Sequence, residues 1–355
     1  MVDFWNGKRI LITGHTGFKG SWLAFWLNSF GADVCGFALE PDTQPSLFSD
    51  LRIAEQIRSV IGDIRDLNSF EKLMVDVQPE IVFHLAAQSL VRRSYRMPVD
   101  TYSTNLMGTV HVLEAIRNVG SVKSAVIVTT DKVYENEERE LGYVESDRLG
   151  GFDPYANSKA CAELAVAAYR NSFYGDGGPL VATARAGNVI GGGDWSEDRL
   201  LPDVFRSLIF GDELAIRNPA SVRPWQHVLD PLNGYMALAK RLFEGDLKCA
   251  DAWNFGPSDE DAKEVGWILN EIKGMWDGGV TWAIADGKQP HESHLLKLDS
   301  SNARSKLQWT PKLALADAVR LTAEWYRGFK NGEDLISLTS RQIELFEGIN
   351  AATTN

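Results

Sequence analysis

Cysteine is scarce in this chain of 355 residues, with only Cys35, Cys161 and Cys249. The three are far apart, their number is odd, and no Cys-x-x-Cys pair occurs. Disulfide frameworks and structural zinc sites both need more cysteines at closer spacing. The pattern therefore argues against both kinds of site, leaves no metal centre to expect, and favours structural thiols in a reducing, cytoplasmic environment.

Basic residues and long apolar runs are also in short supply. The chain has 36 Lys and Arg against 48 Asp and Glu, a formal net charge of −12. A protein that binds nucleic acid needs a basic face, so we expect no nucleic acid as the main partner. No apolar run reaches the ~18 residues of a membrane span, and the N-terminus shows no signal-peptide pattern. These absences predict a cytoplasmic protein with no membrane partner.

What is present begins with a glycine-rich stretch, 13–20 (TGHTGFKG), between an apolar run of strand type and a helical run. In a doubly wound sheet, such a strand-to-helix turn holds the pyrophosphate of a dinucleotide against the N–H groups of the first helical turn. Gly14 permits backbone angles closed to other residues, Gly17 leaves room for the phosphates, and Gly20 lets the helix lie close to the strand. A purely structural turn is the alternative. The expected cofactor contacts here are Gly14, His15, Thr16, Gly17, Phe18, Lys19 and Gly20.

Strand-like and helical runs alternate up to about residue 186. Such alternation is typical of an α/β fold, a doubly wound parallel sheet of the Rossmann type. Strands are expected at 9–13, 33–39, 58–62, 81–85, 124–130 and 180–186, and helices at 18–29, 66–77, 98–118 and 154–174. We expect a cofactor domain at 1–187 with a return segment at 228–256. A smaller mixed α/β substrate domain is expected at 188–227 and 257–345, with a loop at 191–195, a helix from 199 and a frayed tail beyond about 345.

The end of the second strand bears on the choice of dinucleotide. NAD-binding sheets usually place Asp or Glu there, beside the ribose. Here that position is Ala38, with Glu40 and Asp42 nearby and no basic residue before Arg52. This favours NAD over NADP. After the third strand, Asp63 and Ile64 are expected to meet the adenine, although Asp also caps helices well, and the two interpretations of Asp63 are left open.

The fourth strand ends in His84 and a short run with two alanines, which keep the backbone open to a cofactor. His84 itself is better explained as a core histidine with satisfied hydrogen bonds. The cofactor contacts expected in this run are Leu85, Ala86, Ala87 and Gln88.

Tyr155 and Lys159 lie four residues apart, so they share one face of a helix. A cation one turn away favours the phenolate and should lower the pKa of Tyr155, which makes it a base at neutral pH. Lys159 is also expected to hold the cofactor ribose. Thr129 and Thr130 close the preceding strand, where Thr130 can steady the reacting oxygen and Thr129 can meet the cofactor.

Together these segments resemble the extended short-chain dehydrogenase/reductase family. Within it, the chain is similar to the nucleotide-sugar 4,6-dehydratases, above all the branch that acts on CDP-glucose. The resemblance covers nearly the whole chain and is carried most specifically by 13–22, 84–95, 129–134, 185–195 and 223–228. It implies a hydro-lyase that oxidises C4 of CDP-glucose with NAD, loses water across C5 and C6, and returns hydride to C6. A 4-epimerase, or a dehydratase of a dTDP-, UDP- or GDP-sugar, is the alternative.

The resemblance also implies roles for residues. Asp131 would protonate the leaving hydroxyl, with a turn cap as the alternative. The dTDP-glucose branch has Glu as C5 base where this chain has Lys132. A buried lysine near other cations can act as a base; otherwise Lys132 stabilises the enolate, and Glu135 is a weaker candidate for the base. Further cofactor contacts are expected from Asn105 and Gly187, and substrate contacts from Gln88, Asn188, Arg199, Arg223 and His291.

The family further implies a homodimer and a deoxysugar product destined for a surface polysaccharide. Helices 98–118 and 154–174 carry more apolar positions than one sheet face can cover. On the second, Cys161, Leu164, Ala165 and Ala168 point away from the face of Tyr155 and Lys159. We expect these helices to pair with their copies as a four-helix bundle, with burial inside one subunit as the alternative.

Overall fold

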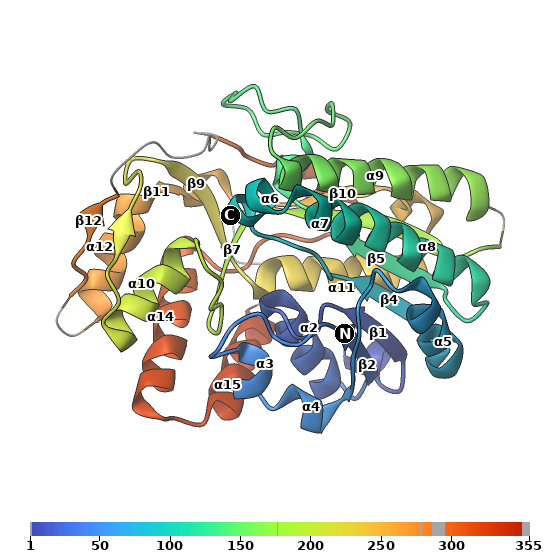
Figure 1. The fold of residues 1–355 in the computed structure, drawn as a ribbon, viewed down its shortest axis with the longest axis horizontal. Helices are drawn as coiled ribbons and strands as arrows, with labels where there is room; N and C mark the ends of the chain where they lie inside the picture. The colour runs from blue at the N-terminus through green and yellow to red at the C-terminus, as the bar shows by residue number, and fades with distance from the viewer. Residues whose placement is uncertain (1, 176, 277–278, 286–294, 350–355) are drawn as a thin grey trace.

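The computed structural model describes residues 2–175, 177–276, 279–285 and 295–349. At its centre lie seven parallel strands in the order β10-β6-β5-β4-β1-β2-β3 (Figure 1). They are β1 (Arg9–Thr13), β2 (Asp33–Ala38), β3 (Arg58–Ile61), β4 (Ile81–His84), β5 (Ser124–Val128), β6 (Leu180–Ala186) and β10 (Ala252–Phe255). The six predicted strands are confirmed, although four of them end one or two residues early. The seventh strand comes from the predicted return segment and pairs with β6.

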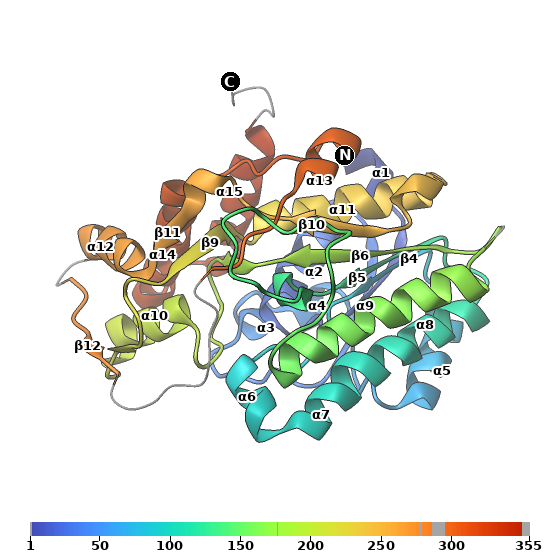
Figure 2. The ribbon, with the colours of Figure 1, turned by 90° about the horizontal axis from the view of Figure 1, so that it is seen from above.

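The sheet is apolar on both faces because helices cover both. On β1, Ile10 and Ile12 belong to one core cluster and Leu11 to another, so alternate side chains enter separate layers. Trp22 of α2 (Phe18–Ser29) lies in the first layer and Val112 of α8 (Gly108–Asn118) in the second. Figure 2 shows the two layers from above. A parallel sheet covered on both sides needs such continuously apolar strands. The first layer also holds α11 (Leu229–Phe243), and the second holds α5 (Leu67–Val77) and α9 (Pro154–Phe173).

The helix predicted at 98–118 contains a widened turn. It begins as α7 (Pro98–Tyr102), passes through the π-helical turn η1 (Ser103–Met107), and continues as α8. Proline at the first helical position costs nothing because its missing N–H has no partner there. Turns of the π type often occur next to functional sites. Here the widened turn places Asn105 in the core beside the cofactor half of the cleft described below.

The C-terminal half packs against the carboxyl edge of the large sheet. The strands β7 (Asn188–Ile190), β9 (Val222–His227) and β11 (Ala262–Glu264) form one small sheet, and β8 (Ala215–Ile216) pairs with β12 (Ala283–Ile284). The predicted loop at 191–195 and the helix from 199 are confirmed, the latter as α10 (Leu200–Phe210). The other long helices are α12 (Val265–Met275), α14 (Leu315–Asn331) and α15 (Leu335–Gly348).

The expected frayed tail beyond residue 345 is wrong for residues 346–348. Helix α15 continues to Gly348, and Phe346 is fully buried with its ring edge-on to Trp26 of α2. An aromatic side chain with a core partner holds a terminal helix in place, and the polar composition of the last five residues concealed this.

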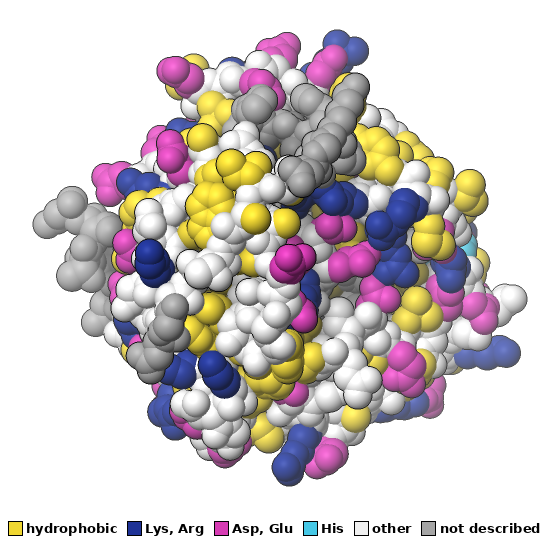
Figure 3. Space-filling view, turned by 60° about the vertical axis from the view of Figure 1, so that its left-hand side comes forward, with side chains coloured by type: hydrophobic (Ala, Val, Ile, Leu, Met, Phe, Trp, Pro, Cys, Tyr) yellow, Lys and Arg dark blue, Asp and Glu magenta, His cyan; other side chains and the backbone are white. Residues whose placement is uncertain are grey.

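None of the described helices is both long and apolar enough to cross a bilayer. On the face drawn in Figure 3, basic and acidic side chains are interspersed and apolar side chains appear in separate patches.

Candidate functional site

A cleft of about 1220 Å³ runs along the carboxyl edge of the large sheet, between that edge and the C-terminal half. In open α/β sheets, ligands bind at this edge. One end of the cleft is lined by the glycine-rich turn, the middle by the end of β5 and the start of α9, and the other end by α10 and the loops around β8 and β9.

The glycine-rich turn has the geometry that a pyrophosphate site needs. Gly14 has a φ of +79°, and a Cβ there would lie 2.6 Å from the Ala86 nitrogen. A Cβ on Gly20 would lie 2.0 Å from the Gly14 oxygen, so both positions require glycine. Gly17 is the N-cap of α2, and a Cβ there would meet within 4 Å only the Gly14 oxygen, at 3.5 Å, since its other side faces the cleft. The first N–H groups of α2 lack helical partners and lie beside this opening.

The end of the cleft where adenosine contacts were predicted is lined by Leu39, Glu40, Asp42, Asp63 and Ile64. Leu39 lies just beyond β2 and is 55% exposed. Asp63 pairs with Arg65 at 2.6 Å, and this hydrogen bond holds the pKa of Asp63 below its usual value. The helix-cap interpretation of Asp63 is wrong, because Asp66 caps α5 by accepting from the Ser69 N–H.

Two residues predicted to contact the cofactor lie behind the cleft wall. The side chain of His15 is fully buried, with Nε2 2.7 Å from Ser59 Oγ, and burial lowers its pKa to about 4. The Asn105 side chain is also buried, where it accepts from the Gln88 N–H at 2.8 Å and donates to the Gln88 carbonyl at 2.9 Å. His15 therefore packs in the core, and Asn105 positions Gln88, which lines the cleft. A one-dimensional motif does not distinguish a residue at the cleft wall from one behind it.

The histidine at the end of β4 is a satisfied core residue, as expected. The nitrogens of His84 lie 2.7 Å from Thr13 Oγ1 and 3.1 Å from Thr109 Oγ1. Burial lowers its pKa to about 3, so the ring is neutral.

All five residues predicted to be catalytic line the middle of the cleft: Thr130, Asp131, Lys132, Tyr155 and Lys159. The first three follow β5 at the short 3₁₀ turn η2 (Asp131–Val133), and the last two lie in the first two turns of α9. Asp153 caps α9, and Pro154 starts it, so the helix begins just before Tyr155. The phenol of Tyr155 hydrogen-bonds the Thr130 side chain.

The expected lowering of the Tyr155 pKa by Lys159 is wrong for this structure. Burial raises the pKa of Tyr155, and this rise is opposed by the hydrogen bond with Thr130 and by the charges of Lys132 and Arg199. The Lys159 ammonium donates to the Val128 carbonyl at 3.0 Å instead. Burial also lowers the pKa of Lys159 to about 8. Helical spacing predicted the shared face, but not the loss of solvent around both groups.

Asp131 is 2% exposed and accepts from Thr130 Oγ1 at 2.9 Å, with the Lys132 ammonium 3.3 Å away. It does not act as a cap, since Thr130 caps η2. A Cβ on Gly187 would lie 2.9 Å from the Asp131 carboxylate, so glycine at 187 makes room for this side chain. The arrangement presents a buried carboxyl group to the cleft.

A lysine was expected to act as a base only if it is buried near other cations, and Lys132 is not buried. Its side chain is 37% exposed and paired with the Asp131 carboxylate. Glu135 pairs with Arg148 at 2.9 Å, is 49% exposed, and does not line the cleft. Of the two candidates for the C5 base, only Lys132 reaches the cleft.

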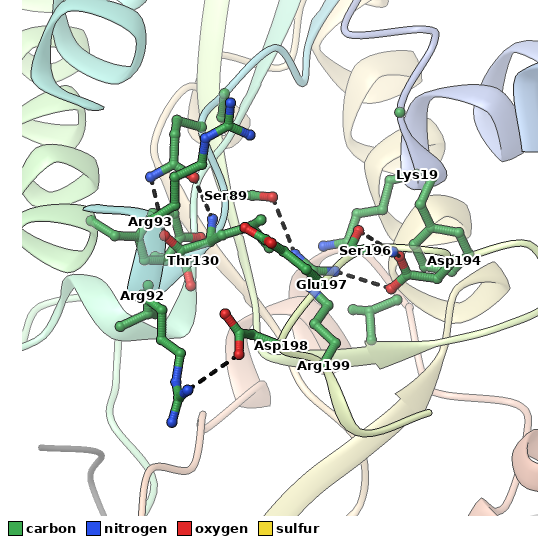
Figure 4. A pocket seen from close by; sticks show the side chains of 18 of the residues that line it. Lys19, Ser89, Arg92, Arg93, Thr130, Asp194, Ser196, Glu197, Asp198 and Arg199 are labelled. Atoms are coloured by element: carbon green, nitrogen blue, oxygen red, sulfur yellow. Dashed lines mark hydrogen bonds and ion pairs between the residues drawn. The ribbon is translucent and has the colours of Figure 1, made fainter. Parts of the chain in front are cut away.

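The opposite end of the cleft, where substrate contacts were predicted, includes Asn188, Arg199 and Arg223. Arg199 lies 3.2 Å from the Asp194 carboxylate and donates to Ser89 Oγ at 3.2 Å (Figure 4). Lys19 extends from the glycine-rich turn toward the same space, and burial followed by the charge of Arg199 lowers its pKa to about 7. The predicted contact His291 lies outside the described residues.

A set of arginine pairs across the cleft mouth was missed from the sequence. Arg92 and Arg96 of α6 (Val91–Arg96) pair with Asp198 and Glu197 of the facing loop, at 3.3 and 3.0 Å (Figure 4 shows the first pair). The basic pair Arg92-Arg93 was the available signal, but Asp198, the partner of Arg92, lies 106 residues further along the chain. Within the part of the chain that the structure describes, no group of side chains is arranged to hold a metal ion.

Several known proteins are similar to this chain in sequence or in fold. The family model described as GDP-mannose 4,6 dehydratase matches residues 11–322. A CDP-glucose 4,6-dehydratase from Salmonella typhimurium is 49% identical, over 97% of this chain and 98% of that protein. A solved dTDP-glucose 4,6-dehydratase from Streptomyces venezuelae, with NAD bound, has a TM-score of 0.76 and 25% identity, covering 92% of this chain and 99% of that one. A UDP-glucose 4-epimerase from Thermotoga maritima has a TM-score of 0.78 at 24% identity, covering 90% and 99%, and shares the fold.

Proposed function

We propose that this chain is an NAD-dependent hydro-lyase. It belongs to the nucleotide-sugar dehydratase family described by the GDP-mannose 4,6 dehydratase model. Its substrate is CDP-glucose, and its product is CDP-4-dehydro-6-deoxyglucose. The observation that carries the proposal is the 49% identity to a CDP-glucose 4,6-dehydratase over 97% of the chain. Asp131 and Lys132 at the cleft support a dehydratase, because loss of water needs a proton donor at the leaving oxygen.

The residues present fit NAD. The elbow of Gly14, Gly17 and Gly20 would hold the pyrophosphate, Asp63 and Ile64 the adenine end, and Lys159 the nicotinamide ribose. Both arginines near the adenosine end are already paired with carboxylates, Arg65 with Asp63 and Arg93 with Asp42, which disfavours a ribose 2′-phosphate. When bound, NAD supplies the acceptor for the C4 hydride and returns it to C6.

Tyr155 removes the proton of the sugar 4-hydroxyl as C4 is oxidised. The phenol is buried, so the phenolate depends on the hydrogen bond with Thr130 and the charges of Lys132 and Arg199. A positioned base of this kind contributes roughly 10²–10⁴ in rate. The C4 ketone then acidifies the C5 proton.

Loss of water uses the turn after β5. Asp131 donates a proton to the departing 6-hydroxyl, and Lys132 takes the C5 proton or stabilises the enolate from beside it. A proton first passes from Lys132 to Asp131 across their salt bridge, so that Asp131 is protonated and Lys132 is neutral. One proton then leaves Asp131 for the departing hydroxyl and one arrives at Lys132 from C5; where Lys132 only stabilises the enolate, water takes the C5 proton. Asn188, Arg199 and Arg223 hold the diphosphate, for which the planar guanidinium is suited.

Incubation of the purified protein with CDP-glucose tests the proposal. A 4-keto product that absorbs in alkali is expected. Formation of CDP-galactose would instead identify a 4-epimerase, the alternative that shares the fold and the Tyr155–Lys159 pair. Side-by-side binding of CDP, UDP and dTDP would establish the base preference.

We also propose that the chain forms a homodimer in the cytoplasm through the outer faces of α8 and α9, which pack side by side (Figure 2). Leu164 and Phe173 of α9 are 59% and 52% exposed, as apolar positions at an unformed interface would be. The division into a cofactor domain at 1–187 with its return segment and a substrate domain formed by the rest is part of this proposal. Sedimentation showing only monomer at micromolar concentration would contradict the dimer.

A further inference from the structure

A buried ion pair lies beneath the catalytic turn and has no part in the steps above. Glu163 of α9 and Arg185 of β6 are both 3% exposed. The guanidinium binds the carboxylate with two bonds, Nη2 to Oε2 at 2.8 Å and Nε to Oε1 at 3.0 Å. A protein in which apolar residues of similar volume replace a buried ion pair is often as stable as the original. Stability of the fold alone is therefore a weak reason for this ion pair.

The pair is bonded to both ends of the segment 129–134, which carries Thr130, Asp131 and Lys132. Thr129 donates its hydroxyl to Glu163, and the next residue, Thr130, bonds Tyr155 and Asp131. At the other end, Arg185 donates to the Tyr134 hydroxyl at 2.7 Å. The turn 129–134 is therefore tied at its start and its end to one ion pair.

Glu163 also faces Lys159, one turn earlier on α9. Burial lowers the pKa of Lys159 to about 8, and the Glu163 carboxylate opposes that fall. Lys19 of α2 and His84 of β4 share this buried region, and the charge of Lys159 contributes to the lowered pKa of each. The carboxylate of Glu163 is thus the charge that stabilises the Lys159 cation.

We propose that Glu163, oriented by Arg185, is a positioning residue that holds the turn 129–134 against α9 and keeps Lys159 cationic. The proposal rests on the proposed function, in which Lys159 supports the phenolate of Tyr155 and binds the cofactor ribose. It also assigns a role to Arg185, the first residue of the segment 185–195 that was singled out in the sequence.

The variant Glu163→Gln tests the charge while keeping the shape. Loss of a nearby opposite charge should move the alkaline limb of the pH profile of kcat down by about one pH unit or more. At a fixed pH above both limbs, the active fraction of the variant should be about tenfold lower than that of wild type for each pH unit by which the limb has moved. Calorimetric NAD binding should show the same displacement, which gives a readout independent of turnover. Glu163→Asp keeps the charge and shortens the side chain, so it should lower kcat with the limb little moved.

Thr183→Val is the matched control, since it removes the 2.7 Å bond to Glu163 but neither charge nor any bond to the turn 129–134. It should leave the limb in place. If Glu163→Gln does not fold, Glu163→Gln combined with Arg185→Met removes both charges and must show the same displacement of the limb. A folded Glu163→Gln or double variant with wild-type pH profiles for kcat and NAD binding would overturn the proposal. Wild-type protein that binds NAD but leaves CDP-glucose unchanged would instead count against the proposed function, and the NAD titrations would still decide the role of Glu163.

Discussion

Replacing Asp131 with Asn separates the two halves of the proposed reaction. The amide keeps the size of the carboxyl group and still accepts the 2.9 Å hydrogen bond from Thr130. It cannot donate a proton to the leaving 6-hydroxyl as a carboxylic acid does. Oxidation at C4, which uses Tyr155, should therefore proceed, while loss of water should slow by roughly 10²–10⁴.

The magnitudes allow this chemical effect to be distinguished from a stability effect. A loss of 10²–10⁴ in rate corresponds to about 3–5 kcal/mol in the barrier. Asp131 is buried, but Lys132, its ion-pair partner among the described contacts, is 37% exposed, so the cation left behind stays solvated. The free energy of unfolding should therefore fall by about 1–2 kcal/mol. The variant should melt close to wild type and yet be nearly inactive.

The assay is a single-turnover reaction with CDP-glucose, followed by the absorbance of NADH and, in alkali, by that of the 4-keto-6-deoxy product. We expect NADH to accumulate in Asp131→Asn, whereas in wild type it stays low because hydride returns to C6. Glu135→Gln is the control, since Glu135 pairs with Arg148 outside the cleft. Normal product formation by Asp131→Asn would refute the assignment of the acid.

Three other perturbations follow from the geometry. Gly20→Ala places a Cβ 2.0 Å from the Gly14 oxygen, so the turn must open, and NAD affinity measured by calorimetry should fall by more than about tenfold. Gly187→Ala brings a Cβ to 2.9 Å from the Asp131 carboxylate, so kcat should fall, and an unchanged kcat would show that Asp131 can move freely. Burial lowers the pKa of His227 to about 3 from its ordinary 6.5, so the unfolded state binds the extra proton below pH 6.5 and stability falls as the pH falls from there. His227→Phe should therefore reduce the slope of unfolding free energy against pH, between about pH 5 and 6, by about 1.4 kcal/mol per pH unit.

The positions of the strands along the chain, and residues that line the cleft after β5, could be predicted because both depend on short-range patterns. Continuous apolar runs mark buried parallel strands, and a glycine-rich elbow marks the first turn. Thr130 and Tyr155 were placed together because each stands at the carboxyl edge of the sheet. Missed features depend on contacts between distant segments. Arg92 meets Asp198, and Phe346 meets Trp26, across separations that no local pattern reports.

Charge states also depend on contacts between distant segments, so they were harder to predict than the positions of the residues that line the cleft. From spacing alone, Lys159 should lower the pKa of Tyr155. In the folded chain both groups are buried, and the Lys159 ammonium is bonded to the Val128 carbonyl. Burial then disfavours the charged form of each, raising the pKa of Tyr155 and lowering that of Lys159.

Because Tyr155 and Lys159 are both buried, the phenolate of Tyr155 needs support from charges other than Lys159. Lys132 and Arg199 act on the phenol from other segments of the chain, and Glu163 acts on Lys159 from the next turn of α9. The carboxylate of Glu163 is itself held in place by Arg185 of β6, so its effect depends on the packing of α9 against the sheet. The pH dependence of this enzyme should accordingly respond to Glu163, which lies behind the cleft wall, as strongly as to residues that line the cleft.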